Sequence, residues 1–93
     1  MLLLPETLTA REARDTLRML TTALEKEAKA SAAELVVDGS PLQRFDSSAL
    51  AVLLECQRQT QAWGKRFAVK HMPQQLAELA KLYGATDLLP TAA

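Results

Sequence analysis

The first candidate site in the sequence is formed by Asp46, Ser47 and Ser48, which stand together directly before the apolar run "ALAVLL". A serine here could be a nucleophile. If Asp46 or Ser47 caps a helix, the first turn also has free backbone N–H groups and the positive end of the helix dipole, which favour an anion. A purely structural interpretation competes with both, since Asp and Ser are common helix-capping residues.

Other reactive side chains are too few for a catalytic site. His71 and Cys56 are the single histidine and the single cysteine, and no glycine-rich loop precedes a helix. A single cysteine excludes an intrachain disulfide and a cysteine-based metal cluster, so Cys56 is interpreted as a small buried thiol. We therefore expect no catalytic residue, no metal and no cofactor. An esterase that uses Ser47 is a remote alternative.

Composition excludes several classes of partner. The 93 residues contain 11 Lys and Arg against 11 Asp and Glu, so no overall field attracts nucleic acid or anionic lipid. The basic group Lys65, Arg66 and Lys70 is short and favours a solvated strand end over a nucleic-acid surface. No stretch approaches the roughly 20 apolar residues that span a bilayer, and the start lacks the features of a secretory signal. We expect one soluble, cytoplasmic domain over residues 1–93, with no direct membrane insertion.

Three helices are predicted from apolar spacing and capping residues. The first begins at Thr9, which forms a Thr-x-x-Glu capping box with Glu12. An apolar stripe in helical spacing follows, at Ala13, Leu17, Leu20, Leu24 and Ala28. The second begins at Asp46 or Ser47 and runs to about residue 63, and Gly64 follows as a left-handed cap. The third begins after Pro73 and ends before the next glycine, at 84. The tail at 85–90 is expected to pack back on the domain.

Strands are predicted between these helices. "ELVVD" at 34–38 has the continuous apolar character of a central strand covered on both faces, "KRFAVKH" at 65–71 follows the second helix, and "LLL" at 2–4 precedes the first. The resulting β-α-β-α-β-α order predicts an α/β fold of mainly parallel strands packed against helices. A three-stranded parallel sheet is thin, which indicates that a further strand or a partner uses its edge.

The second helix carries more apolar residues than one sheet can bury. Residues 50–54 cannot all face the same surface, so part of this helix is expected to be exposed or to contact a partner. In a chain this small, that surplus favours binding over catalysis.

Residues 34–90 resemble a STAS domain, the fold shared by anti-sigma factor antagonists and the cytoplasmic tails of sulfate transporters. The resemblance rests on the strand that ends in "VVD" and on "FDSSALAVLLE", which matches the Asp-Ser-Ser-x-Leu position of the family. The ending "LAKLYGATDLLP" is similar to the MlaB subgroup, the small STAS subunit of an ABC complex that moves phospholipid between the Gram-negative membranes. STAS domains usually start with one more strand, which we expect to be absent here, and its absence would leave an edge open for self-association.

The resemblance implies a non-enzymatic protein in which Ser47 is a phosphoacceptor or regulatory residue. It implies one of two partners. The first is the ATPase subunit of an ABC transporter, which would hold the protein at the inner face of the inner membrane. The second is an anti-sigma factor kinase, in which case the protein is an anti-sigma factor antagonist switched by phosphorylation at Ser47. The expected partner-binding residues surround the start of the second helix: Phe45, Asp46, Ser47, Ser48, Leu50 and Ala51.

Overall fold

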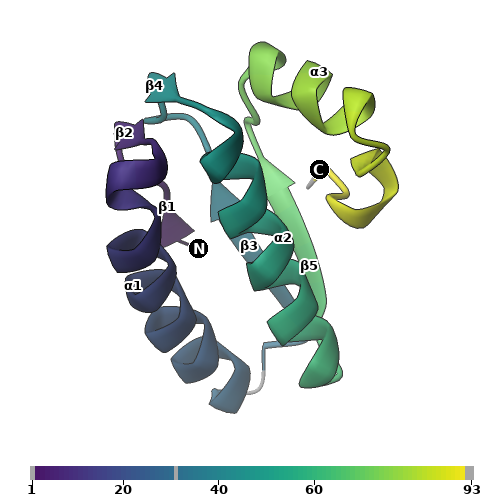
Figure 1. The fold of residues 1–93 in the computed structure, drawn as a ribbon. Coiled ribbons are helices and arrows are strands. Elements are labelled where there is room, and N and C mark those ends of the chain that lie inside the picture. The colour runs from purple at the N-terminus through teal and green to yellow at the C-terminus, as the bar shows by residue number, and fades with distance from the viewer. Residues whose placement is uncertain (1, 31, 92–93) are drawn as a thin grey trace.

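Parallel strands and three helices alternate along the chain in a computed structural model that describes residues 2–30 and 32–91. Figure 1 shows α1 and α2 side by side in front of the sheet, with α3 beyond β5. The helices are α1 (Ala10–Lys29), α2 (Ser47–Ala62), α3 (Gln74–Leu82) and the short 3-10 helix η1 (Thr86–Leu88). The strands are β1 (Leu2–Leu3), β2 (Thr7–Leu8), β3 (Glu34–Asp38), β4 (Arg44–Phe45) and β5 (Arg66–Lys70).

The strand pairings confirm the predicted α/β class. The larger sheet has the order β1-β3-β5, and both of its pairings are parallel, with Val37 of β3 opposite Leu2 and Val69. The tail adds to this sheet, because the Val69 amide donates to the Pro90 carbonyl at 2.9 Å and Leu89 is buried. The sequence did not predict the second sheet, in which β2 pairs in parallel with β4.

Helix boundaries follow the capping residues that the sequence predicted. The Thr9 and Glu12 capping box is formed, and the Thr9 amide donates to the Glu12 carboxylate at 2.8 Å. Asp46, and not Ser47, caps α2. Gly64 and Gly84 follow the ends of α2 and α3 with φ of 73° and 69°, a left-handed conformation that glycine adopts without steric cost.

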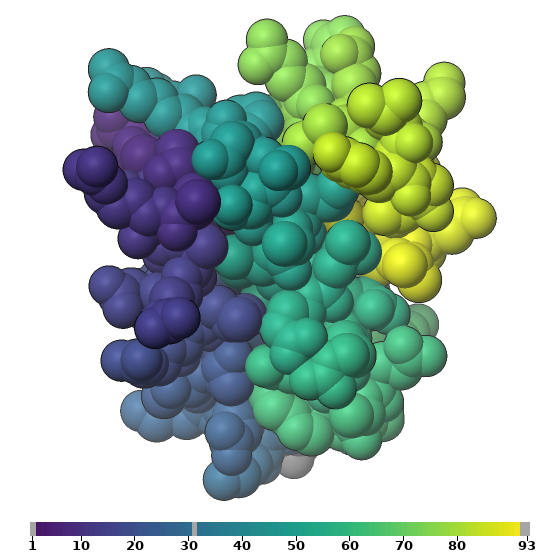
Figure 2. All heavy atoms as spheres, viewed as in Figure 1, coloured from purple at the N-terminus to yellow at the C-terminus, as the bar shows by residue number. Residues whose placement is uncertain are grey.

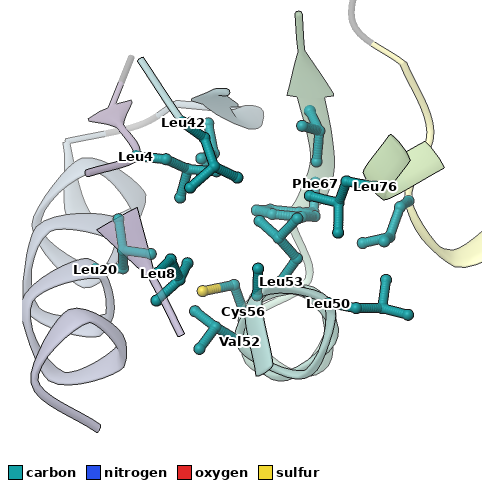
Figure 3. Packing of buried hydrophobic residues seen from close by; sticks show 14 of the residues in the cluster. Leu4, Leu8, Leu20, Leu42, Leu50, Val52, Leu53, Cys56, Phe67 and Leu76 are labelled. Carbon is teal, nitrogen blue, oxygen red and sulfur yellow. The ribbon is translucent and has the colours of Figure 1, made fainter. Parts of the chain in front are cut away.

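The core explains why α2 is apolar nearly all round. Figure 3 looks along α2 and shows its side chains leaving in three directions: Leu50 on the side of Leu76 of α3, Leu53 towards Phe67 of β5, and Cys56 on the side of α1. Leu53 and Cys56 are fully buried. Most of the apolar surplus in α2 is therefore buried inside the chain against two other helices and the sheet.

The two faces of the sheet are covered unequally. Leu35 and Val37 of β3 point towards α1 and α2 and are buried. Val36 points to the opposite face and is only half-buried, and Leu3 of the neighbouring β1 is 58% exposed. The strand at 34–38 is central, as predicted, but the expectation that both of its faces are covered is wrong at Val36, because α1 and α2 pack on the same side. Within the described residues, no helix is both long and apolar enough to cross a membrane.

Candidate functional site

The short β2–β4 pairing brings the starts of α1 and α2 together. Leu8 lies opposite Phe45, and the Glu6 carbonyl accepts hydrogen bonds from the amides of Gln43 and Arg44 at 2.8 and 3.0 Å. Each strand leads within two residues into a helix, so the two helix starts lie at the same end of the molecule (Figure 1). This pairing joins segments more than 35 residues apart in sequence, and it creates the local surface around Ser47.

Asp46 links both helix starts through one carboxylate. Its Oδ1 accepts a hydrogen bond from the Ser48 amide at 2.8 Å, and its Oδ2 accepts one from the Ala10 amide, at the start of α1, at 3.2 Å. These bonds, that from Ser48 first, lower the pKa of Asp46 below its usual value of 3.8. The carboxylate is therefore charged at neutral pH, and it is already engaged by two backbone donors.

Ser47 is the first residue of α2 and is exposed. Its hydroxyl makes no hydrogen bond with any residue that the structure describes, whereas the Ser48 amide donates to Asp46 and Ser48 is half-buried. The two serines therefore differ: Ser48 takes part in the capping turn, and the Ser47 hydroxyl is available to solvent or to a partner. The Ser47 side chain takes no part in the cap that Asp46 forms.

A shallow groove of about 310 Å³ lies beside these serines, between α1 and α2. Figure 2 shows the face on which α1 and α2 lie side by side. The two helices are also joined by the Thr21 hydroxyl, which donates to the Gln59 side chain at 2.9 Å. The groove is lined by Ala13, Arg14 and Leu17 of α1 and by Ser48, Ala51 and Val52 of α2.

Sequence reasoning missed the α1 side of this groove. Ala13 and Leu17 belong to the predicted apolar stripe of α1, and both are only half-buried because they lie at the margin of the contact with α2. Their spacing of four residues places them on one helical face, but the pattern could not show which element that face meets. Arg14 carried no signal except its position next to the stripe.

The expected partner-binding residues occupy different environments. Asp46, Ser47 and Ala51 are exposed, and Ser48 is half-buried at the groove. Phe45 is half-buried and packs against the core cluster.

The expectation that Leu50 contacts a partner is corrected, because Leu50 is only 3% exposed and lies on the side of α2 that packs against α3. It therefore has almost no area to offer a partner.

A second polar cluster lies at the ends of β3 and β5. His71 Nδ1 is 3.2 Å from Asp38 Oδ1, and this carboxylate also accepts a hydrogen bond from the Ser40 amide at 2.8 Å. These contacts, that from Ser40 first, lower the pKa of Asp38. No hydrogen bond joins His71 to a serine hydroxyl in the described part of the chain, so Ser47 is not paired there with an imidazole base.

Burial blocks thiol chemistry at Cys56, and the described residues contain no cluster that could hold a metal ion. Cys56 is fully buried, and desolvation first, then the charge of Glu55, raises the pKa of its thiol to about 12. Across residues 2–30 and 32–91, no group of three or more His, Cys, Asp or Glu side chains could hold a metal ion. The exposed Ser47 hydroxyl and the groove beside it are open to contact by another surface.

Comparison with known protein families agrees with the α/β fold. A family model described as "Mlab, STAS domain" matches residues 7–90, which include α1, α2, α3 and the groove. A search among curated proteins found no match.

Proposed function

The chain belongs to the STAS domain family, and on that premise we propose that it is a non-enzymatic subunit that binds the ATPase of an ABC transporter for phospholipid. In this role it would stabilise or regulate the ATPase. It would also stand in the cytoplasm, at the inner face of the inner membrane, through that partner. The MlaB-type description of the matching family supports the choice of partner.

One observation carries this proposal: the exposed Ser47 hydroxyl, which has no hydrogen bond among the residues that the structure describes, stands beside an apolar groove where Asp46 joins two helix starts. Ala51 is exposed at the groove, and the half-buried Ala13 and Leu17 leave apolar surface there. The Asp46 carboxylate fixes both helix starts, so little ordering is required when a partner binds. Apolar surface with a polar group at its margin is the usual composition of a protein interface.

A second candidate function is an anti-sigma factor antagonist that a kinase switches by phosphorylating Ser47. The exposure of the Ser47 hydroxyl favours it, because a kinase must reach the acceptor oxygen. A phosphate there would add negative charge next to the Asp46 carboxylate and change how this surface meets a partner. Both functions use the same surface and differ in the identity of the partner.

The two functions are separated by measuring which protein binds the purified chain. The ATPase subunit and any anti-sigma factor kinase of the native host are each titrated against the chain by calorimetry. Binding of the ATPase supports the transporter role, and binding of the kinase with loss of affinity after phosphorylation of Ser47 supports the alternative.

Docking in the groove is tested with two matched alanines of α2. Ala51 lines the groove and Ala62 is exposed at the far end of the same helix. The variant Ala51→Trp fills the groove and is expected to abolish the complex with the ATPase on size-exclusion chromatography, whereas Ala62→Trp is expected to leave it intact. An intact complex with Ala51→Trp would place the docking surface elsewhere.

A further inference from the structure

Three arginines of α1 form a row beside the groove. Arg11, Arg14 and Arg18 are spaced by three and four residues, so they share one face of the helix, and all three are exposed. Arg14 is in the groove lining itself, next to Leu17. We use the name arginine row for Arg11, Arg14 and Arg18.

Two of the three side chains in the arginine row are unpaired among the residues that the structure describes. Among the residues that the structure describes, Arg14 and Arg18 make no ion pair and no side-chain hydrogen bond. Other basic side chains do: Arg58 makes two hydrogen bonds to Glu55 at 2.7 and 2.6 Å, and Lys29 lies 3.4 Å from Glu25. The groove therefore has an available guanidinium at its margin.

The acidic groups nearest to the groove are mostly engaged already. Glu12 accepts hydrogen bonds from the Thr9 amide and hydroxyl, and Asp46 accepts one backbone bond from each helix. Asp15 is exposed four residues after Arg11 and three before Arg18, so it shares their helical face, but it makes no ion pair with either among the residues that the structure describes. The groove thus combines an apolar floor with a net positive margin on the α1 side.

We infer that the segment of the ATPase that occupies this groove is amphipathic and acidic, with an apolar side chain between Leu17 and Ala51 and a carboxylate that pairs with Arg14. This inference rests on the proposed function and adds the chemistry of the partner. A guanidinium matches a carboxylate through two parallel hydrogen bonds, which fixes orientation as well as charge. The acidic side chain of the partner is placed at the arginine row, because near Ser47 the Asp46 carboxylate would repel it.

The test compares charge reversal at Arg14 with a matched reversal elsewhere. Arg66 of β5 is also exposed, so Arg66→Glu changes the net charge by the same amount away from the groove. Against the ATPase subunit, Arg14→Glu is expected to weaken binding about tenfold or more and Arg14→Gln by a smaller factor, with Arg66→Glu close to wild type. Raising the salt concentration from about 0.05 to 0.5 M should weaken ATPase binding by the wild-type chain more than ATPase binding by Arg14→Gln.

The outcomes separate the inference from the proposed function. If the wild-type chain does not bind the ATPase, the proposed function fails and this inference fails with it. If the ATPase binds but Arg14→Glu and Arg66→Glu have the same affinity, the inference is wrong and the proposed function stands. Arg14→Gln, checked by circular dichroism, covers the case in which Arg14→Glu does not fold. A photo-crosslinker at Arg18, which is exposed beside the groove and outside its lining, must also capture an ATPase segment that contains Asp or Glu, and capture of a basic segment would overturn the inference.

Discussion

Ser47 provides the sharpest test, because its replacement should separate stability from binding. The hydroxyl is exposed and makes no hydrogen bond within the described residues, and Asp46 supplies the cap of α2. Ser47→Ala should therefore change the free energy of unfolding by no more than about 0.5 kcal/mol. For a chain of this size, such a change moves the melting temperature by roughly 2–4 °C at most.

Ser47→Glu should leave stability similar and still disrupt binding. A carboxylate in the first turn of a helix gains about 0.3–1 kcal/mol from the helix dipole, and the neighbouring Asp46 carboxylate offsets part of this gain. In a desolvated contact with the ATPase, the same charge is unpaired and costs about 3 kcal/mol, or roughly 150-fold in Kd. Ser47→Ala removes at most one hydrogen bond across the contact, about 1 kcal/mol or fivefold.

Two measurements on the same samples check this prediction. Thermal unfolding by circular dichroism gives the melting temperature, and calorimetry against the ATPase gives the affinity. Gln75→Glu is the matched control, since it adds an acid to the exposed first turn of α3 and should affect neither. Unchanged affinity in Ser47→Glu, or collapse of the melting temperature in Ser47→Ala, would show that Ser47 serves only the helix start.

Four further predictions concern the rest of the chain. The Cys56 thiol, fully buried and with its pKa raised to about 12, should resist maleimide in the native protein and react only in denaturant; fast native labelling would contradict the buried position. The pKa of Asp46 is lowered on folding, so its stabilising effect is present above the unfolded value of 3.8 and is lost as pH falls through the folded value. In the variant Asp46→Asn, the free energy of unfolding in urea should therefore depend less on pH in the acid range. An unchanged pH dependence would count against the two backbone hydrogen bonds that Asp46 accepts. The chain should not bind ATP, since it has no phosphate-binding glycine loop; saturable micromolar binding by calorimetry would disprove this. Finally, β1 lies at the edge of the larger sheet with Leu3 exposed, so we expect self-association in analytical ultracentrifugation, and strictly monomeric sedimentation at high concentration would refute pairing through this edge.

Local signals predicted most of the elements and their ends correctly. The Thr9 and Glu12 capping box, the Asp46 cap and the left-handed glycines at 64 and 84 all occur where residue type and spacing indicated. Each of these features depends on contacts within a few residues, which a single sequence contains in full. The short β2 and β4 strands were missed because two residues carry no alternation that a pattern could detect.

The candidate site was predicted only in part. The start of α2 was recognised, and the structure exposes Ser47 and Ala51 there. Leu50 was assigned to the same surface, but it is buried on the side of α2 that faces α3. Apolar character alone could not distinguish a side chain that contacts a partner from one that contacts another helix of the same chain.

The order of helices and strands, their caps and the parallel α/β class could be predicted from residue types alone, because these depend on local spacing and on the right-handedness of crossover connections. Three features become visible only in the folded chain: Asp46 also bonds the start of α1, Leu50 is buried, and a groove with α2 is completed by Ala13, Arg14 and Leu17. Each of these facts depends on contacts between residues about 25 to 40 positions apart. The physical reason is the β2–β4 pairing, which sets two helix starts side by side and so turns two separate sequence patterns into one surface.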